Sequence, residues 1–341
     1  MAVTWREAMT AALYGPDGFF ISGEGPAAHF RTSTHASPIF GAALLGVLTW
    51  VDNVLGHPDR LDVVDVGAGR GELLSLLART APPPLRHRLQ LTCVELAPRP
   101  DSLPASIEWR NQLPSKVTGL LLATEWLDNV PVEVAEAGPD KWRYVMVDAA
   151  NGSESFGPPV VGADARWLHE WWPKTPGGRA EVGRYRDVAW AEAVAAIDRG
   201  LALTVDYGHL RKDRPYAGTV TGFRAGRQVP PVPDGSCDLT AHVTMDSAAA
   251  AGSAVADRPY LLIRQREALQ ALGADGARPP LTLASTDPAR YLRALSAASA
   301  AAELIDPTGL GAHWWLLQPV GIDAVGSIGE IVGRDPGTGV P

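Results

Sequence analysis

Apolar and polar positions along the first sixty residues repeat with a helical period. In residues 4–14, Thr4 and Glu7 form a capping-box pattern, and the apolar residues that follow recur on one helical face. A turn rich in glycine and proline ends this pattern. An apolar stretch over 37–55 then predicts a second, buried helix. Residues 1–60 are therefore expected to form a helical N-terminal region.

From residue 61 the pattern changes to short apolar strands that alternate with helices. Residues 61–66 and 201–206 are apolar runs bounded by turn signals, which is typical of strands buried on both faces. Because strands and helices alternate, we expect a parallel, doubly wound α/β sheet. The other expected elements are strands over 89–95, 120–124 and 314–318 and helices over 72–80, 188–199, 248–256 and 297–302.

The same pattern divides the chain beyond residue 60 into three parts. Residues 61–149 are expected to form the first part of the core. Residues 150–197 are rich in Gly, Pro and Trp without sustained periodicity, which indicates an insertion or lid whose tryptophans pack internally rather than stack on substrate. Residues 198–341 complete the core with the substrate-side and C-terminal elements.

Composition and charge remove several classes of function. The 341 residues carry 30 Lys+Arg against 38 Asp+Glu, a net charge of −8, so no nucleic-acid partner is expected. The two cysteines, Cys93 and Cys237, are too few for a disulfide framework or a CxxC metal site, and no metal is expected. The longest apolar run is too short to span a bilayer, and the first residues lack a signal-peptide pattern. We therefore expect a cytoplasmic protein without membrane insertion.

The most informative stretch is the glycine turn after the strand at 61–66. Gly67, Gly69 and Gly71, with Ala68 between the first two, allow the backbone to approach a ligand at the carboxyl edge of the sheet. The dinucleotide fingerprint needs another glycine where this chain has Glu72. A carboxylate at the helix start opposes pyrophosphate, whereas S-adenosylmethionine carries no phosphate and has a cationic sulfonium and amine. The turn therefore favours S-adenosylmethionine over NAD.

Two acidic residues at strand ends support this interpretation. Asp65, just before the turn, suits an ammonium group, and Glu95, at the end of the next strand, could accept hydrogen bonds from both ribose hydroxyls. Each acid alone is a weak signal. The predicted cofactor site consists of Asp65, Gly67, Ala68, Gly69, Gly71 and Glu95.

A series of short motifs makes the chain recognisable. They are Tyr14-Gly15-x-x-Gly18-Phe19-Phe20, Phe30-Arg-Thr-Ser33, Ser37-Pro38-x-Phe40-Gly41, Glu125-Trp-Leu-Asp128-Asn-Val-Pro131-Val132, Asp206-Tyr-Gly-His209 and Asp238-Leu-Thr-Ala-His242-Val243. Together they resemble the MidA family of class I S-adenosylmethionine-dependent methyltransferases, from about Leu13 to Gln318. The resemblance implies a Rossmann-like, seven-stranded sheet with a helical N-terminal region and an inserted lid-like segment.

The resemblance also implies a substrate class. The family includes a mitochondrial complex I assembly factor that methylates a protein arginine, so a protein substrate is expected, with arginine the first candidate. The segment from His29 to His35 departs from the family pattern, which commonly has two acids and a proline there. This departure keeps open a non-catalytic assembly or interaction factor that retains the fold. An NAD-dependent dehydrogenase is a third alternative, without an identified hydride-transfer site, and a homo-oligomer is compatible with each.

Candidate catalytic residues follow the strand at 120–124. Glu125 and Asp128 would share one face of a helical turn, and a carboxylate pair can hold a guanidinium by parallel hydrogen bonds. For Asp128, a cap on the turn that follows is an equal alternative. His209 and His242 lie in matching motifs and could act as a base or orient a substrate, although a structural role is commoner for a lone histidine. The catalytic candidates are therefore Glu125, Asp128 and His209.

Overall fold

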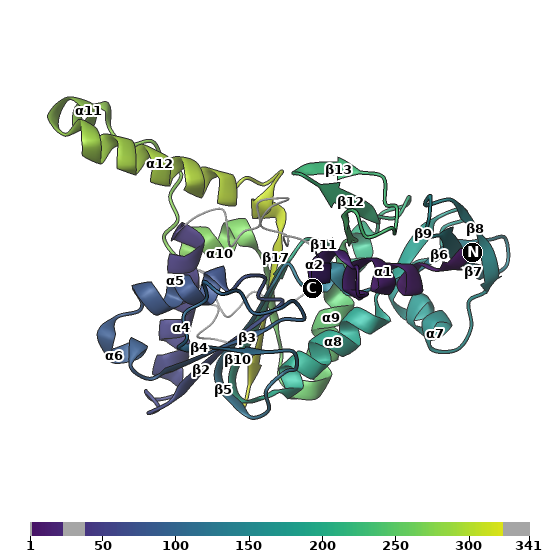
Figure 1. Cartoon of the computed structure of the whole chain (residues 1–341), viewed down its shortest axis with the longest axis horizontal. Coiled ribbons are helices and arrows are strands. Elements are labelled where there is room, and N and C mark those ends of the chain that lie inside the picture. Colours follow the sequence, from purple (N-terminus) through teal and green to yellow (C-terminus); the bar gives the residue numbers. More distant parts are fainter. Residues whose placement is uncertain (1, 23–37, 323–341) are drawn as a thin grey trace.

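The computed structural model describes residues 2–22 and 38–322, and its centre is a seven-stranded sheet (Figure 1). The strands, in sheet order, are β16 (Leu261–Arg264), β17 (Trp314–Val320), β10 (Ile197–Asp206), β5 (Val117–Thr124), β2 (Leu61–Val66), β3 (Leu89–Val94) and β4 (Ile107–Arg110). The five strands from β10 to β4 are parallel, and β17 runs antiparallel to both of its neighbours. This arrangement confirms the Rossmann-like, seven-stranded sheet expected from the sequence.

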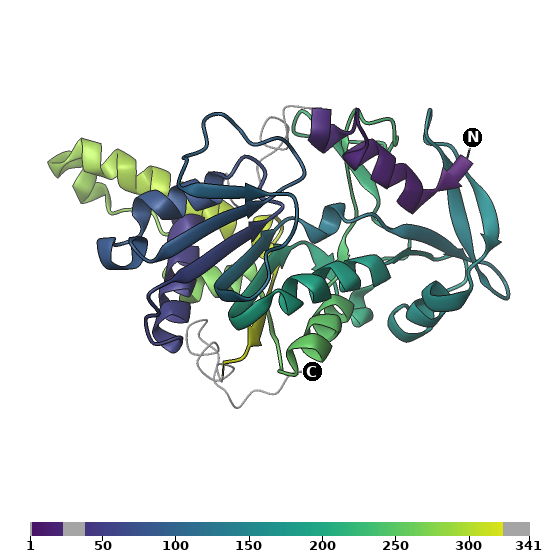
Figure 2. The same cartoon turned by 60° about the horizontal axis from the view of Figure 1, so that its bottom comes forward.

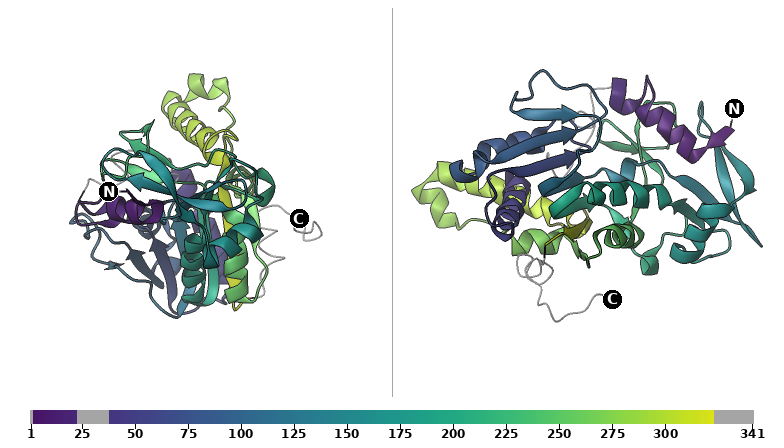
Figure 3. Two further views of the ribbon diagram at one scale, coloured as in Figure 1. Left: turned by 90° about the vertical axis from the view of Figure 1, so that its right-hand side faces the viewer. Right: turned by 90° about the horizontal axis from the view of Figure 1, so that it is seen from below.

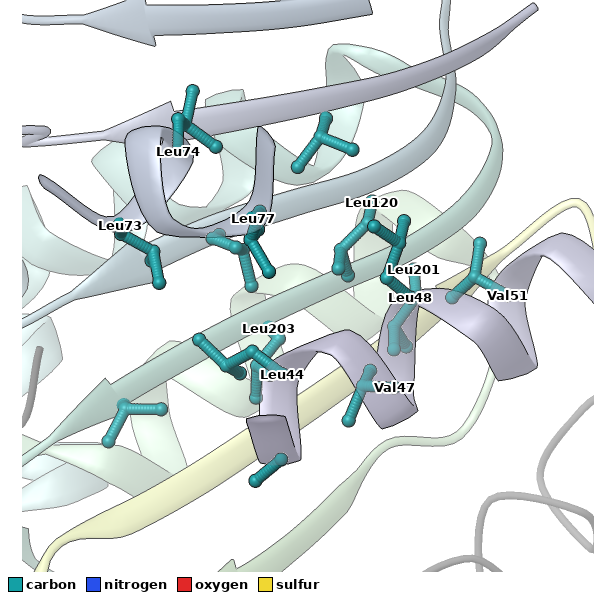
Figure 4. Close-up of a cluster of buried hydrophobic side chains, with 14 of the residues drawn as sticks. Leu44, Val47, Leu48, Val51, Leu73, Leu74, Leu77, Leu120, Leu201 and Leu203 are labelled. Atoms are coloured by element: carbon teal, nitrogen blue, oxygen red, sulfur yellow. The ribbon is translucent and has the colours of Figure 1, made fainter. Parts of the chain in front are cut away.

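Helices cover both faces of this sheet because successive side chains of its strands point to opposite faces. On one face, α4 (Pro38–Val54) and α5 (Glu72–Thr80) pack leucines against Leu120, Leu201 and Leu203 (Figure 4). On the other face, α8 (Arg184–Ala195) and α9 (Met245–Ala256) lie side by side against Leu121 and Ala202 (Figure 2). The two layers fix the strands, and therefore fix the loops at their carboxyl ends.

The connections of the sheet create a crevice beside β2. From β2 the chain proceeds outward to β3 and β4, and then returns to β5 on the other side of β2. At such a switch point the connections diverge, and open α/β sheets bind their ligands there, at the carboxyl ends of the strands. The turn at 67–71 and the segment at 125–129 both lie at this edge.

A second, antiparallel sheet is built mainly from the chain between β5 and α8. It consists of β1 (Ala2–Thr4), β7 (Trp142–Asp148), β6 (Glu133–Ala137) and β9 (Arg179–Val182), with β8 (Glu154–Pro159) also pairing with β7. The helices α1 (Trp5–Tyr14) and α7 (Gly162–Trp171) contribute to its two apolar clusters. The sequence pattern places the start of the insertion at residue 150, but the sheet begins at Glu133. It also includes the N-terminal strand, because Ala2 pairs with Asp148.

The structure confirms two of the local predictions and corrects the end of one predicted helix. The predicted capping box is present, since Thr4 and Glu7 exchange hydrogen bonds at the start of α1. The helix predicted over 188–199 instead ends at Ala195, because Ile197 already pairs with β5. Trp167 and Trp172 are buried in the second sheet's cluster, as predicted for packing residues.

The remaining elements connect these layers or extend from them. They are α2 (Phe19–Ser22), α6 (Pro83–Arg86), α10 (Gln265–Ala271), α11 (Leu281–Thr286), α12 (Pro288–Leu304), β11 (Gly208–His209), β12 (Thr221–Arg224), β13 (Arg227–Val229), β14 (Asp238–Thr240), β15 (Val243–Thr244) and the short 3₁₀ turns η2 (Leu127–Asn129), η3 (Arg211–Asp213) and η4 (Leu310–Ala312). The α11 and α12 helices extend from the end opposite to the second sheet (Figure 3). Within residues 2–22 and 38–322, no helix is long and apolar enough to cross a membrane.

Candidate functional site

The crevice beside β2 opens into a cavity of about 920 Å³. Its walls come from the turn after β2, the start of α5, the segment after β5, the hairpin of β12 and β13, and the loop at 308–313. Asp65, Glu72, Glu125, Asp128 and Asp238 all line it. The cavity is therefore strongly acidic. The altered segment from His29 to His35 lies outside the described residues.

The glycine turn has a backbone that other residues rarely adopt. Gly67, Gly69 and Gly71 have φ angles of 69°, 57° and 79°, all in the left-handed region. A Cβ atom on Gly67 would lie 2.8 Å from Trp126, and one on Gly71 would lie 2.5 Å from Leu103. A Cβ atom on Gly69 would meet only the tip of Glu72, at 3.7 Å. Gly69 therefore borders open space within the cavity wall.

Asp65 is a buried carboxyl group at the base of the turn. It is 4% exposed, and burial together with the carboxylates of Glu72 and Glu95 raises its pKa to about 8. Glu72 accepts a hydrogen bond from the Arg70 backbone N–H at 3.0 Å. Acidic groups on the same side of the turn favour a cationic ligand and oppose a phosphate group.

Glu95 lies on the other side of the turn and lines a second cavity of about 330 Å³. Its carboxylate accepts hydrogen bonds from the backbone N–H groups of Gly69 at 3.0 Å and Leu96 at 2.7 Å. Burial raises the pKa of Glu95, and these hydrogen bonds oppose the rise. The glycine turn lines both cavities, because Gly67 and Gly69 belong to each. Glu95 is therefore hydrogen-bonded directly to the glycine turn, which precedes it in the sequence.

The second cavity also has walls that the sequence pattern does not predict. Tyr14 and Phe20 from the N-terminal region line it with their rings 5.6 Å apart, and Asn111 and Gln112 line it after β4. The position of Asn111 and Gln112 at a strand end is a signal that could have found them. Tyr14 and Phe20 belong to a motif, but nothing local indicates the cavity that they reach.

Glu125 has an unusual backbone conformation at the end of β5. Its φ angle is 51°, and its backbone N–H donates to the Val205 carbonyl at 2.8 Å. A non-glycine residue in this region costs about 1–2 kcal/mol, and such strain gathers at functional sites. The side chain is 9% exposed, and Oε1 lies 3.9 Å from Nδ1 of His313. The conformation therefore places a nearly buried carboxylate in the cavity wall.

Asp128 belongs to a buried polar network beside Glu125. Its Oδ2 accepts hydrogen bonds from the hydroxyls of Tyr207 and Thr240, and the Arg186 guanidinium binds its backbone carbonyl. Burial raises the pKa of Asp128. Its Oδ1 is buried without a hydrogen-bond partner among the described residues. Glu125 and Asp128 thus line the same cavity, although Glu125 is left-handed and lies outside the 3₁₀ turn η2, so they do not share the helical face that their spacing predicts. Asp128 retains one unused acceptor.

His209 does not line either of these cavities. Its Nδ1 lies 2.9 Å from the Arg214 guanidinium, and its ring packs edge-on against Trp172. Burial and the charge of Arg214 lower the pKa of His209 to about 3. His209 lies behind the cavity wall, with its ring centre 6.2 Å from that of His242, and its role as a catalytic residue stays a prediction. His242 and His313 line the larger cavity instead, and no sequence motif predicts His313.

Among the described residues, no group of three or more His, Cys, Asp or Glu side chains is arranged to hold a metal ion. The hydrogen-bonding groups of the cavities are mostly carboxylates, with hydroxyls, neutral imidazoles, side-chain amides, backbone N–H groups and the Arg70 guanidinium. These groups fit a ligand that carries positive charge and hydroxyl groups.

Comparison with known proteins agrees with this geometry. Residues 47–260 match a family described as "Putative S-adenosyl-L-methionine-dependent methyltransferase". The chain is 26% identical over 286 residues to the "Protein arginine methyltransferase NDUFAF7 homolog, mitochondrial" of Drosophila melanogaster. That match covers 70% of this chain and 63% of the fly protein, so the chain spans less than two thirds of that relative.

Two solved structures of a COG1565 superfamily protein from Burkholderia thailandensis share the fold. One, bound to S-adenosyl-homocysteine, has a TM-score of 0.77 and 24% identity, and the match covers 94% of this chain and 89% of that chain. The other, a native crystal structure, has a TM-score of 0.75 and 24% identity, with 94% and 88% covered. The likeness therefore extends over the second sheet and the periphery as well as the central sheet.

Proposed function

The chain belongs to the MidA-like family of S-adenosyl-L-methionine-dependent methyltransferases, and from this premise we propose that it methylates a nitrogen of a protein side chain, with arginine the first candidate. The cofactor, S-adenosyl-L-methionine, supplies an activated methyl group on a cationic sulfonium when bound. The fly relative is named as a protein arginine methyltransferase, which supports the finer proposal. The cytoplasmic location expected from the sequence stays a prediction, and the fly relative is named as mitochondrial.

The residues around the glycine turn fit this cofactor. Gly69 leaves open space where a side chain would otherwise intrude, and Glu95 presents acceptors suited to ribose hydroxyls beside the second cavity. Asp65 and Glu72 suit the cationic end on the other side of the turn. We propose that Asp65, Gly67, Ala68, Gly69, Gly71 and Glu95 hold the cofactor, with Asn111 and Gln112 available to an adenine edge.

One observation carries the proposed reaction. The cavity continues from the glycine turn to Glu125 and Asp128, so a cationic nitrogen held there would face the cofactor side of the same space. Glu125 and the unused Oδ1 of Asp128 are hydrogen-bond acceptors for such a nitrogen. Their role is to orient the nitrogen and balance its charge, since positioning supplies much of the rate in a displacement with an activated donor. The bond from nitrogen to the methyl carbon would form as the carbon–sulfur bond breaks to leave S-adenosylhomocysteine, and the Glu125 carboxylate would accept the proton that the nitrogen loses.

Two measurements test the proposed function. Calorimetric titration with S-adenosylmethionine, S-adenosylhomocysteine and NAD is expected to give binding for the first two and none for NAD. Radiolabelled methyl transfer into an extract of a deletion strain is expected to label proteins, and analysis of the labelled residue identifies the nitrogen. Cofactor binding without any labelling would instead support the non-catalytic assembly factor.

The first prediction concerns Glu95. Glu95→Ala is expected to weaken S-adenosylmethionine binding by about tenfold or more, because it removes the ribose acceptors and the tether to Gly69. Glu95→Gln keeps one acceptor oxygen and is expected to lose less. Calorimetric titration measures both, with the exposed Glu108→Ala as the control. Unchanged affinity of Glu95→Ala would remove this residue from the site.

The second prediction concerns Asp65 and pH. With its pKa raised to about 8, the Asp65 carboxyl is protonated below pH 8 in the free protein, and a cationic ligand favours its ionised form. Binding therefore releases a proton, so affinity is expected to rise with pH up to about 8, by at most about tenfold per pH unit, and then to level.

Asp65→Asn is the matched variant for this effect. It cannot titrate, so the rise of affinity with pH is expected to flatten. Comparison of wild type with this variant by calorimetry at pH 6, 7 and 8 separates Asp65 from the ligand's own amine. An equal pH slope in the two proteins would contradict the assignment.

A further inference from the structure

A third cavity, of about 400 Å³, lies against the second sheet and has no part in the proposed function. Its walls come from the start of α1, the beginning of β8, β9, and the segments 217–220 and 230–232 on either side of the β12–β13 hairpin. We call it the flanking cavity. Gly218, Thr219 and Val220 line both this cavity and the larger one, so the two cavities share a stretch of wall.

The alternation of side chains along β9 brings two charged residues to the flanking cavity. Ala180 and Val182 point to the apolar cluster on one face of the second sheet. Arg179 and Glu181 therefore point to the opposite face, where both line the flanking cavity.

Arg179 is already paired within this cavity. Its guanidinium donates two hydrogen bonds to the Glu154 carboxylate, at 2.6 and 2.8 Å, and the Trp5 indole N–H donates a third at 2.8 Å. Such a two-pronged pair satisfies the hydrogen-bonding groups of both partners. Glu154 and Arg179 balance each other, so Glu181 gives the described lining of the cavity a net negative charge.

Glu181 has one oxygen in use and one without a partner. The residue is 1% exposed, and its Oε1 accepts a hydrogen bond from the Thr219 backbone N–H at 2.6 Å. Its Oε2 is buried without a hydrogen-bond partner among the described residues. Burial raises the pKa of Glu181, which the Thr219 hydrogen bond and the Arg186 charge oppose. A buried acceptor without a donor costs about 1–3 kcal/mol, so the site favours a ligand that donates, and a cation most of all.

Gly218 lets the shared wall lie close to this carboxylate. Its φ angle is 78°, and a Cβ atom there would lie 2.8 Å from Glu181 Oε1. The wall between the two cavities is therefore fixed to Glu181 by the backbone of Gly218 and Thr219.

The rest of the flanking cavity suits an aliphatic chain. Four of its lining residues present apolar surface: Trp5, Pro230, Pro231 and Val232. A lysine side chain combines an apolar stem, which packs on such surface, with an ammonium group that donates hydrogen bonds. The chemistry of the cavity therefore matches lysine at both ends of the side chain.

We propose that the flanking cavity is a second substrate subsite, which binds a lysine side chain close in sequence to the methylated residue, with the ammonium on Glu181. The shared wall at residues 218–220 supports this arrangement, because a chain bound across it reaches both cavities. This inference rests on the proposed function and deepens it, since it restricts the substrate to segments with a second basic residue.

The first test uses small probes with the protein saturated with S-adenosylhomocysteine. The probes are N-acetyl-lysine methylamide and N-acetyl-norleucine methylamide, which has the same stem without the ammonium group. NMR titration follows two signals. The Trp5 indole N–H reports the flanking cavity and the His242 ring reports the larger cavity, because each residue lines only one of the two.

Three variants accompany the wild type. Glu181→Gln removes the charge but keeps an oxygen that can accept from Thr219. Asn151→Trp, at an exposed position in the cavity wall, fills the flanking cavity without altering Glu181. Glu170→Gln, at an exposed position on α7, is the control. Cofactor titration of each variant checks that the fold is intact.

The expected results differ between the two signals. In wild type and Glu170→Gln, the lysine probe shifts the Trp5 signal and binds there about tenfold or more tightly than the norleucine probe. In Glu181→Gln and Asn151→Trp, the affinity measured at Trp5 falls by about tenfold to a hundredfold, as for loss of a hydrogen bond to a charged group. The affinity measured at His242 stays at the wild-type value.

The second test connects the two cavities. It uses peptides with one fixed arginine and one lysine placed at successive positions on either side of it, each paired with a peptide that has norleucine in place of lysine. At the preferred spacing, the lysine peptide is expected to shift both signals and to bind more tightly than its norleucine counterpart. Glu181→Gln is expected to abolish that difference.

Three results would overturn the inference. They are equal binding of the lysine and norleucine probes at Trp5, a wild-type titration of Trp5 in Glu181→Gln, and the absence of any peptide that shifts both signals. Failure of the proposed function has a different signature. In that case no probe or peptide shifts the His242 signal of a cofactor-competent protein, whereas the Trp5 signal still responds to the lysine probe.

Discussion

Replacing Gly69 with valine is expected to lower the affinity for S-adenosylmethionine by about a hundredfold, the scale of overpacking a filled site. The Cβ of residue 69 would enter open space in the cavity wall, where only the tip of Glu72 lies within 4 Å. The protein itself therefore has space for part of the valine side chain. The bound cofactor is proposed to occupy the same space, so the two would clash.

Valine at this position also has a conformational cost. Gly69 has a φ of 57°, and a side chain in the left-handed region costs about 1–2 kcal/mol of the free energy of unfolding. Gly273→Val is the matched control, because Gly273 has a φ of 91° and no atom within 4 Å of an added Cβ. Both variants are expected to lower the melting temperature by a similar amount.

Calorimetric titration then separates cofactor space from backbone strain. Cofactor affinity is expected to fall in Gly69→Val and to stay at the wild-type value in Gly273→Val. Full affinity in a folded Gly69→Val protein would contradict the assignment of the turn. A fall in both variants would show that strain alone disturbs the site.

The central sheet could be predicted because its signals are local. The run at 61–66 is buried on both faces and matches β2, and the helix predicted over 72–80 matches α5. The second sheet could not be read in this way. Its order depends on pairing between β1 and β7, which are far apart in the chain, and several β8 positions are exposed. Partly exposed, distantly paired strands leave little apolar periodicity.

Non-local pairing also explains the wrong end of the helix at 188–199. The residues from Ile197 onward pair with β5, and this pairing prevails over the local helical pattern.

The cofactor side and the substrate side of the candidate site also differ in whether local or non-local structure places their residues. Asp65, the glycine turn and Glu95 lie on consecutive elements, so their order at one sheet edge follows from strand spacing. His209 and His313 could not be distinguished from sequence. The local pattern gives no sign that β11 pairs with β15, or that His209 contacts Arg214 and Trp172 and does not line the cavity. It also gives no sign that Gln265 holds the loop of His313 at the cavity wall.

Glu125→Gln is expected to reduce methyl transfer by roughly a hundredfold, as for the loss of one positioned charged group in an active site. Glutamine keeps the shape of the side chain but removes the charge that balances a cationic nitrogen. Glu125 lines both cavities but is not among the residues proposed to hold the cofactor, so S-adenosylmethionine affinity is expected to stay close to that of wild type. Asp128→Asn is expected to lose less, because Tyr207 and Thr240 still hold the side chain in place.

The measurement is radiolabelled methyl transfer into an extract of a deletion strain, with a cofactor titration of each variant. Glu170→Gln, at an exposed position on α7, is the control for the same chemical change outside the cavity. If Glu125→Gln labels at the wild-type rate, Glu125 does not orient the substrate. If it loses cofactor affinity in parallel with labelling, the residue acts on the cofactor side. A rate loss with intact cofactor binding is the one result that places Glu125 at the substrate nitrogen, because only that role separates turnover from cofactor affinity.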